Sequence, residues 1–234
     1  MKIVNRIVVT IMAFSVFPLM FFLNLVRAVL SISEDSSLYS ILSKIASDTV
    51  NSRMEITLSV KEAMGYFKDG KFSFAGMDFS TKKIPAEMLV TKNWLIAAAV
   101  LLVVALLIAL VIAGCAIFTE AYRTEMCLGA GGIVCAFAAV RCFAKFAAPF
   151  VNGKIDIGEM LAKNLLGDDS GIVGTLGTAF LKKSISVDVL QLSNAVMLLA
   201  IVFFAIILWT LAFYITLPEK DKPKRIKKSA GAKR

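Results

Sequence analysis

Three basic residues stand within or beside the long apolar runs of this chain. They are Arg27, Arg141 and Lys145. A charge inside a membrane span is costly, so such a residue marks a functional site by default. All three stand toward one end of an apolar run, where a long basic side chain can reach a lipid headgroup or a carboxylate. We therefore expect structural or anionic-lipid contacts for them, with a substrate or ion pathway as the alternative.

Acidic residues follow both arginines at a short distance along the chain. A guanidinium group binds a carboxylate or a phosphate through two parallel hydrogen bonds, which an ammonium group does not do. We expect each arginine to anchor the base of the loop that follows it through such a pair. The carboxylates we expect are Glu34 or Asp35 for Arg27, and Asp156 or Glu159 for Arg141.

The residue types needed for most catalysis are absent or scattered. The chain has no histidine, which excludes histidine-based triads and imidazole metal ligands. The glycines between residues 167 and 177 lack the Lys-Ser/Thr pair that completes a phosphate-binding loop. We therefore predict no catalytic residue, no metal site and no cofactor, and hence no enzyme. Four cysteines in or at the ends of apolar runs are expected to be packing residues: Cys115, Cys127, Cys135 and Cys142.

Four apolar runs must position these residues. Hydrophobic residues make up 58% of the 234 residues, more than a soluble domain of this length carries. Each run reaches the roughly 20 residues that a helix needs to cross a bilayer. We predict an all-α membrane protein: four transmembrane helices with a small mixed extracytoplasmic domain built from two loops. The runs are Ile7 to Val26, Trp94 to Phe118, Cys127 to Phe150 and Ala195 to Leu217.

The predicted segments divide the whole chain. The N-terminus and first span cover 1–30, the first extracytoplasmic loop 31–93, the second span 94–118, a cytoplasmic turn 119–126, the third span 127–150, the second extracytoplasmic loop 151–194, the fourth span 195–217, and a basic tail 218–234.

The net charge of +9 is concentrated at the two ends of the chain. Lys2 and Arg6 precede the first span, and the tail 218–234 holds eight basic residues against two acidic ones. Basic segments next to spans stay in the cytoplasm, so we expect both termini there, in a multi-pass protein of the cell membrane. The basic residues face a membrane surface, which argues for lipid and against nucleic acid as a partner. No Asn-x-Ser/Thr sequon occurs, which favours a bacterial membrane.

Apolar periodicity predicts structure in the first loop. Ile56, Val60, Met64 and Phe67 recur at a helical period, which predicts a helix. The Asp69-Gly70 pair that follows is a strong signal for the turn of a β-hairpin.

Small residues at helical spacing predict how the second and third spans pack. Such stripes let two helices approach closely in lipid. We expect a tight antiparallel pair in which Ala109 faces Gly132, while Leu102 and Leu106 face lipid. The expected packing residues are Ala105, Ala109, Ala113, Gly132 and Ala136.

These patterns favour a non-enzymatic role. We expect a scaffold or accessory subunit whose extracytoplasmic domain binds another membrane or extracytoplasmic protein. A small transporter or channel component is the alternative, although the second and fourth runs offer few polar residues for a pathway. The order of spans and loops resembles tetraspan families such as the claudins. The loops lack the Trp…Gly-Leu-Trp motif and the paired cysteines of that family, so no function is carried over.

Overall fold

The structure is a computed structural model that describes residues 2–33, 36, 53–59, 71–74, 77–80, 86–119, 121–155 and 184–217. It is mostly helical, with additional β-strands. The elements in chain order are α1 (Lys2–Phe22), β1 (Asn24–Ile32), β2 (Arg53–Ser59), β3 (Lys71–Phe74), β4 (Met77–Ser80), α4 (Ala86–Phe118), α5 (Tyr122–Val151), β5 (Ile185–Leu192) and α8 (Asn194–Thr216).

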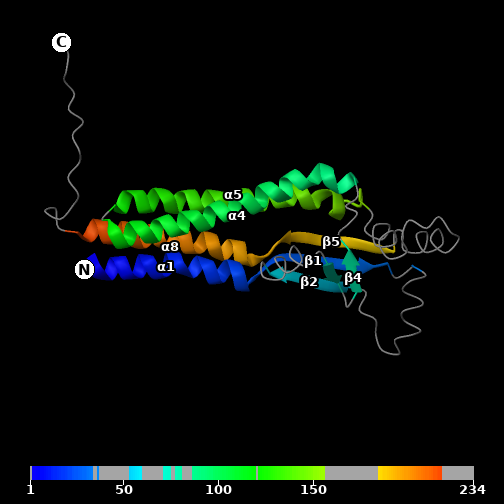
Figure 1. Ribbon diagram of the computed structural model, residues 1–234, viewed down its shortest axis with the longest axis horizontal. Coiled ribbons are helices and arrows are strands. Elements are labelled where there is room, and N and C mark those ends of the chain that lie inside the picture. The colour runs from blue at the N-terminus through cyan, green and yellow to red at the C-terminus, as the bar shows by residue number, and fades with distance from the viewer. Residues whose placement is uncertain are drawn as a thin grey trace, which may run out of the picture.

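Four helices form one bundle (Figure 1). α4 packs against α1 and α5, and α8 packs against the same two helices on the other side. Each of the four is long and apolar enough to cross a membrane. This agrees with the four spans predicted from the sequence.

The two ends of the bundle differ. α1 begins and α8 ends at one end, which we call the terminal end; the strands extend from the other, which we call the sheet end (Figure 1). α4 and α5 have 33 and 30 residues, whereas α1 and α8 have 21 and 23. All four helices have one end at the terminal end. The longer helices α4 and α5 therefore extend beyond α1 and α8 at the sheet end, alongside the strands (Figure 1).

A three-stranded antiparallel sheet with the order β2-β1-β5 stands at the sheet end. β2 alternates polar and apolar residues from Arg53 to Ser59, and β5 does so from Ile185 to Asp188. Side chains of successive strand residues point to opposite faces, so alternation gives a sheet one polar and one apolar face. The sheet therefore has one face suited to water and one suited to packing.

Ser193 joins the sheet to the bundle. Its backbone N–H donates to the Leu25 carbonyl at 2.7 Å, and its hydroxyl donates to the Asn24 carbonyl. Its hydroxyl oxygen also accepts from the N–H of Ala195, which caps the N-terminus of α8. One residue, Leu23, separates α1 from β1, and Ser193 alone separates β5 from α8. The sheet is thus fixed directly to two helices.

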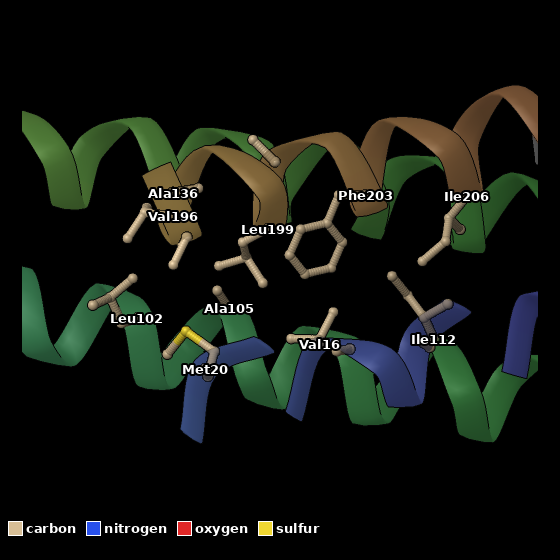
Figure 2. Packing of buried hydrophobic residues seen from close by; sticks show 14 of the residues in the cluster. Val16, Met20, Leu102, Ala105, Ile112, Ala136, Val196, Leu199, Phe203 and Ile206 are labelled. Carbon is tan, nitrogen blue, oxygen red and sulfur yellow. The ribbon is translucent and has the colours of Figure 1, made fainter. Parts of the chain in front are cut away.

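The bundle core is apolar through its middle. Figure 2 shows Val16 of α1, Ala105 and Ile112 of α4, and Leu199 and Phe203 of α8 pointing toward one another. Each of these five side chains is at most 2% exposed. The large apolar side chains on the outside of the helices are exposed, as expected for helices surrounded by lipid.

One prediction for the first loop is wrong, and the other falls on residues outside the described ranges. The helix predicted to contain Ile56 is wrong, because Arg53–Ser59 is strand β2 paired with β1. A two-stranded ribbon does exist, but it pairs β3 with β4, and Asp69-Gly70 precedes it in the chain. Asp69 and Gly70 themselves, and the apolar positions 60, 64 and 67, lie outside the described ranges, so the predicted turn is not tested.

The helix boundaries also differ from those expected. α1 ends at Phe22, so the residues 24–30 that we assigned to the first span belong to β1. α4 begins at Ala86, eight residues before the predicted start at Trp94. Strand pairing with β5 and β2 outweighs the helical tendency of the apolar segment after Phe22, because both partners satisfy its backbone hydrogen bonds.

Candidate functional site: the polar face of the sheet

The polar face of the sheet gathers charged and hydroxyl residues from all three strands. Residues two apart on a strand share a face, so Arg27 and Ser31 of β1 lie on the same side. β2 contributes exposed side chains, and so does β5. The same face also carries Val29 and Val189. The polar residues of this face, which we call the polar face, are Arg27, Ser31, Arg53, Glu55, Thr57, Ser186, Asp188 and Gln191.

Arg27 and Glu55 form a bidentate pair on this face. Nε of Arg27 lies 2.6 Å from Oε1 of Glu55, and Nη2 lies 3.2 Å from Oε2. The hydrogen bond to Glu55, followed by the attraction of its charge, raises the pKa of Arg27 above its ordinary value. Arg27 thus stays charged throughout the usual pH range. Both side chains are about half exposed, so water screens the pair and it contributes little to stability.

The carboxylate that Arg27 binds is not one of those expected. The β1–β2 register places Thr57 opposite Arg27 and Glu55 opposite Val29, so Glu55 is the diagonal neighbour of Arg27. This pairing depends on a contact between strands that are distant in sequence, which proximity along the chain does not reveal. The expected partners, Glu34 and Asp35, lie outside the described residues.

Asp188 connects β5 to both other strands. The Ser31 hydroxyl donates to its Oδ1 at 2.7 Å, and Nε of Arg53 lies 3.6 Å from its Oδ2. The hydroxyl of Ser186 lies 2.7 Å from that of Ser31. A β-bulge occurs here, since Val29 pairs with Val189 and Leu30 with Val187, leaving Asp188 as the extra residue. The bulge turns Asp188 toward the polar face.

The opposite face of the sheet packs against α5. Val26, Leu190 and Leu192 contact a cluster that contains Phe143 and Ala98, and Leu30 and Val187 contact a second cluster around Phe150. Because one face is buried in this way, the register and the identity of the polar face are fixed.

Lys145 and Arg141 lie at the same level of α5 as the base of the sheet. Nζ of Lys145 lies 4.2 Å from the ring centroid of Trp94, which links α5 to α4. Arg141 is exposed, two residues before the buried Phe143. Asp156 and Glu159, its expected partners, lie outside the described residues, and within those residues no ion pair of Arg141 is found.

The Lys145–Trp94 contact can be tested by a double-mutant cycle. We expect Trp94→Leu and Lys145→Met to show a coupling energy of about 0.5–1 kcal/mol in the free energy of unfolding, typical of an exposed cation–π pair. The same cycle for Trp94→Leu with Arg141→Met should show no coupling, since Arg141 does not contact the ring. Coupling that is equal in the two cycles would reject the assignment.

The predicted packing residues are buried, and the neighbour of Gly132 differs from the one expected. Ala105, Ala109, Ala113 and Ala136 are at most 2% exposed. A Cβ added to Gly132 would lie 2.7 Å from ring atoms of Phe203 on α8, so Gly132 faces α8 rather than Ala109. Leu102 was expected to face lipid and instead belongs to the core; Leu106 packs partly against it.

Sequence reasoning missed a group of buried polar residues at the terminal end. Asn5 and Glu125 are each 1% exposed and Thr210 is fully buried. Glu125 stood just outside the predicted third span, so it was counted with the loop. A signal was available: Glu125, Gly129, Gly132 and Ala136 are spaced four, three and four residues apart, which places them on one face of a helix.

The described residues contain no group of three or more His, Cys, Asp or Glu side chains that could hold a metal ion. The four cysteines are free thiols. Comparison with protein families, curated proteins and solved structures gives no match for this chain.

Proposed function

We propose that this chain is a multi-pass protein of the cell membrane in which the sheet end faces out of the cytoplasm and both termini lie inside. In this proposal it acts as a scaffold or accessory subunit, and the polar face of the sheet binds another protein. The basic residues concentrated at the two chain ends support the orientation, because such segments remain on the cytoplasmic side.

The transition from helix to strand supports the position of the lipid boundary. An open sheet edge cannot lie in hydrocarbon, because its backbone groups would lack partners. The boundary then falls near Leu23 and Ser193, where α1 gives way to β1 and β5 to α8. The 21 residues of α1 span about 31 Å, which matches a hydrocarbon layer of about 30 Å. Lys145 and Trp94 then lie at headgroup level, outside the hydrocarbon.

The observation that carries the proposed binding role is the polar face itself. It holds two arginines and two carboxylates in cross-strand contacts, and it is attached to α1 and α8 with one residue between strand and helix. An exposed sheet face of mixed charge suits another protein rather than a small molecule, which prefers a concave and mostly apolar site.

The alternative role as a transporter or channel component has less support. A pathway through the bundle needs polar side chains at successive levels, whereas the middle of the core is closed by Val16, Leu199 and Phe203. The buried polar residues at the terminal end favour the alternative, but they occupy only the last turns of the bundle.

Photo-crosslinking in cells tests the proposed binding role. A crosslinking amino acid at Thr57 or Gln191, both exposed on the polar face, should give one discrete protein adduct. The adduct should disappear when Glu55→Lys reverses a charge on that face. A crosslinker at the exposed Val103 of α4, which faces lipid in this proposal, is the matched control and should not give that adduct. If neither polar-face position gives a protein adduct, the binding role is wrong.

A further inference from the structure

Four buried oxygen atoms of the helices have no hydrogen-bond partner among the described residues, and three of them, all but that of Thr10, lie at the terminal end. They are Oδ1 of Asn5, Oγ1 of Thr10, Oε2 of Glu125 and Oγ1 of Thr210. Nearly all buried polar atoms in proteins are paired, so several unpaired oxygens in one region require an explanation. The amide and carboxylate oxygens need a proton donor or a cation, whereas each hydroxyl can be satisfied by a donor or an acceptor.

Three of these side chains belong to different helices at one level of the bundle. Asn5 lies one turn inside α1, Glu125 one turn inside α5, and Thr210 fewer than two turns before the end of α8. The Thr210 hydroxyl lies close to the Glu125 carboxylate across the α5–α8 interface, but not in the geometry of a hydrogen bond. α8 also packs against α1, which carries Asn5. All three side chains are buried at this level of the bundle.

A carboxylate buried in this way cannot remain an isolated negative charge. The cost of removing an ionised carboxylate from water is several kcal/mol even after relaxation, so such a group acquires a proton, a metal ion or a basic partner. Among the described residues, the charged or titratable groups near this end are Lys2 and Arg6 on α1, Cys115 on α4, Tyr122, Arg123 and Cys127 on α5, and Tyr214 on α8. Arg123 is exposed, with its guanidinium carbon 5.9 Å from the Tyr214 ring centroid and Nη2 at 3.4 Å from the Tyr214 hydroxyl.

We propose that Glu125, Thr210 and Asn5 form a buried site for one small monovalent cation, a sodium ion or a proton. The donor set is a carboxylate, a hydroxyl and an amide carbonyl, all hard oxygen ligands of the kind that such cations bind. A proton on Oε2 would act in the same way, since it turns that atom into a donor for a neighbouring unpaired oxygen. The site opens toward the terminal end, because Val9 and Ile206 close the core one turn deeper. This proposal is independent of the binding role of the sheet.

The sodium form of the site is tested by thermal unfolding of the purified protein in detergent. Melting temperatures are compared in sodium, potassium and choline chloride at equal ionic strength. A sodium site gives a saturable rise in melting temperature that is specific to sodium and is lost in Glu125→Gln. Glu55→Gln, which removes an exposed carboxylate from the sheet, is the matched control and keeps the sodium effect.

The proton form is tested by infrared spectroscopy of the same proteins at neutral pH. A protonated Glu125 gives a carboxylic acid carbonyl band in the wild type and in Glu55→Gln that is missing from Glu125→Gln. If Glu125→Gln does not fold, Thr210→Val replaces it, and it should weaken the sodium effect or shift the carbonyl band. A wild-type protein with neither a sodium effect nor a carboxylic acid band has a carboxylate neutralised by its own basic side chains, and this result overturns the proposal.

Discussion

Replacing Gly132 with leucine should destabilise the protein, whereas the same replacement at Gly114, which has open surroundings, should not. A Cβ at Gly132 would already lie 2.7 Å from three ring atoms of Phe203, which is fully buried. The ring has no free space to move into, because Leu199 and Ile206 are also fully buried on the same helix. We expect the free energy of unfolding in detergent to fall by about 1–3 kcal/mol, the usual cost of overpacking a core.

Gly114→Leu is the matched control. No atom lies within 4 Å of a Cβ built at Gly114, so the leucine side chain extends into the surroundings of the bundle. Leucine also has a higher helix propensity than glycine, so the variant should be as stable as the wild type or slightly more stable. Equal losses at Gly132 and Gly114 would show that the close contact between α5 and α8 does not exist.

The four membrane-spanning helices could be predicted from the sequence, because a run of 18 or more predominantly apolar residues is rarely found outside a transmembrane helix. The contact between the second and third spans was also predicted, and α4 does pack against α5. The neighbour that the Gly132 face contacts was not predicted. The stripe containing Gly132 and Ala136 shows that one face of α5 packs closely, but a stripe fits either neighbour. We assigned it to α4 because the two spans are consecutive, whereas the structure places Phe203 of α8 against it.

The sheet was missed because two periodicities compete in short apolar segments. Ile56 and Val60 fit a helical spacing, and Arg53 to Ser59 also alternates strictly between polar and apolar residues. The alternation is the correct signal, since β2 pairs with β1 along its whole length. For Leu25 to Leu30, continuity with the apolar run suggested helix, and only the distant partners β2 and β5 determine that this segment is a strand.

The partners of the candidate site residues also could not be predicted, because they are distant in the sequence. The sequence indicates that Arg27 needs an anionic partner, and the structure supplies one in Glu55, 28 residues away. Glu125 was overlooked because its helix begins at Tyr122, five residues before the apolar run itself. An acidic residue in the first turn of a helix is ordinarily explained by the helix dipole, and only burial distinguishes it here.

The orientation of the bundle is the central claim, and cysteine accessibility tests it most directly. Thr57 is exposed on the polar face of the sheet, and Thr119 is exposed where α4 ends at the terminal end. Single-cysteine variants Thr57→Cys and Thr119→Cys are made in a background without the four native cysteines. Intact cells are then treated with a membrane-impermeant thiol reagent. Labelling of Thr119→Cys after permeabilisation serves as the control for its reactivity. In intact cells the reagent should label Thr57→Cys and leave Thr119→Cys unlabelled; labelling of Thr119→Cys in intact cells would contradict the proposed orientation.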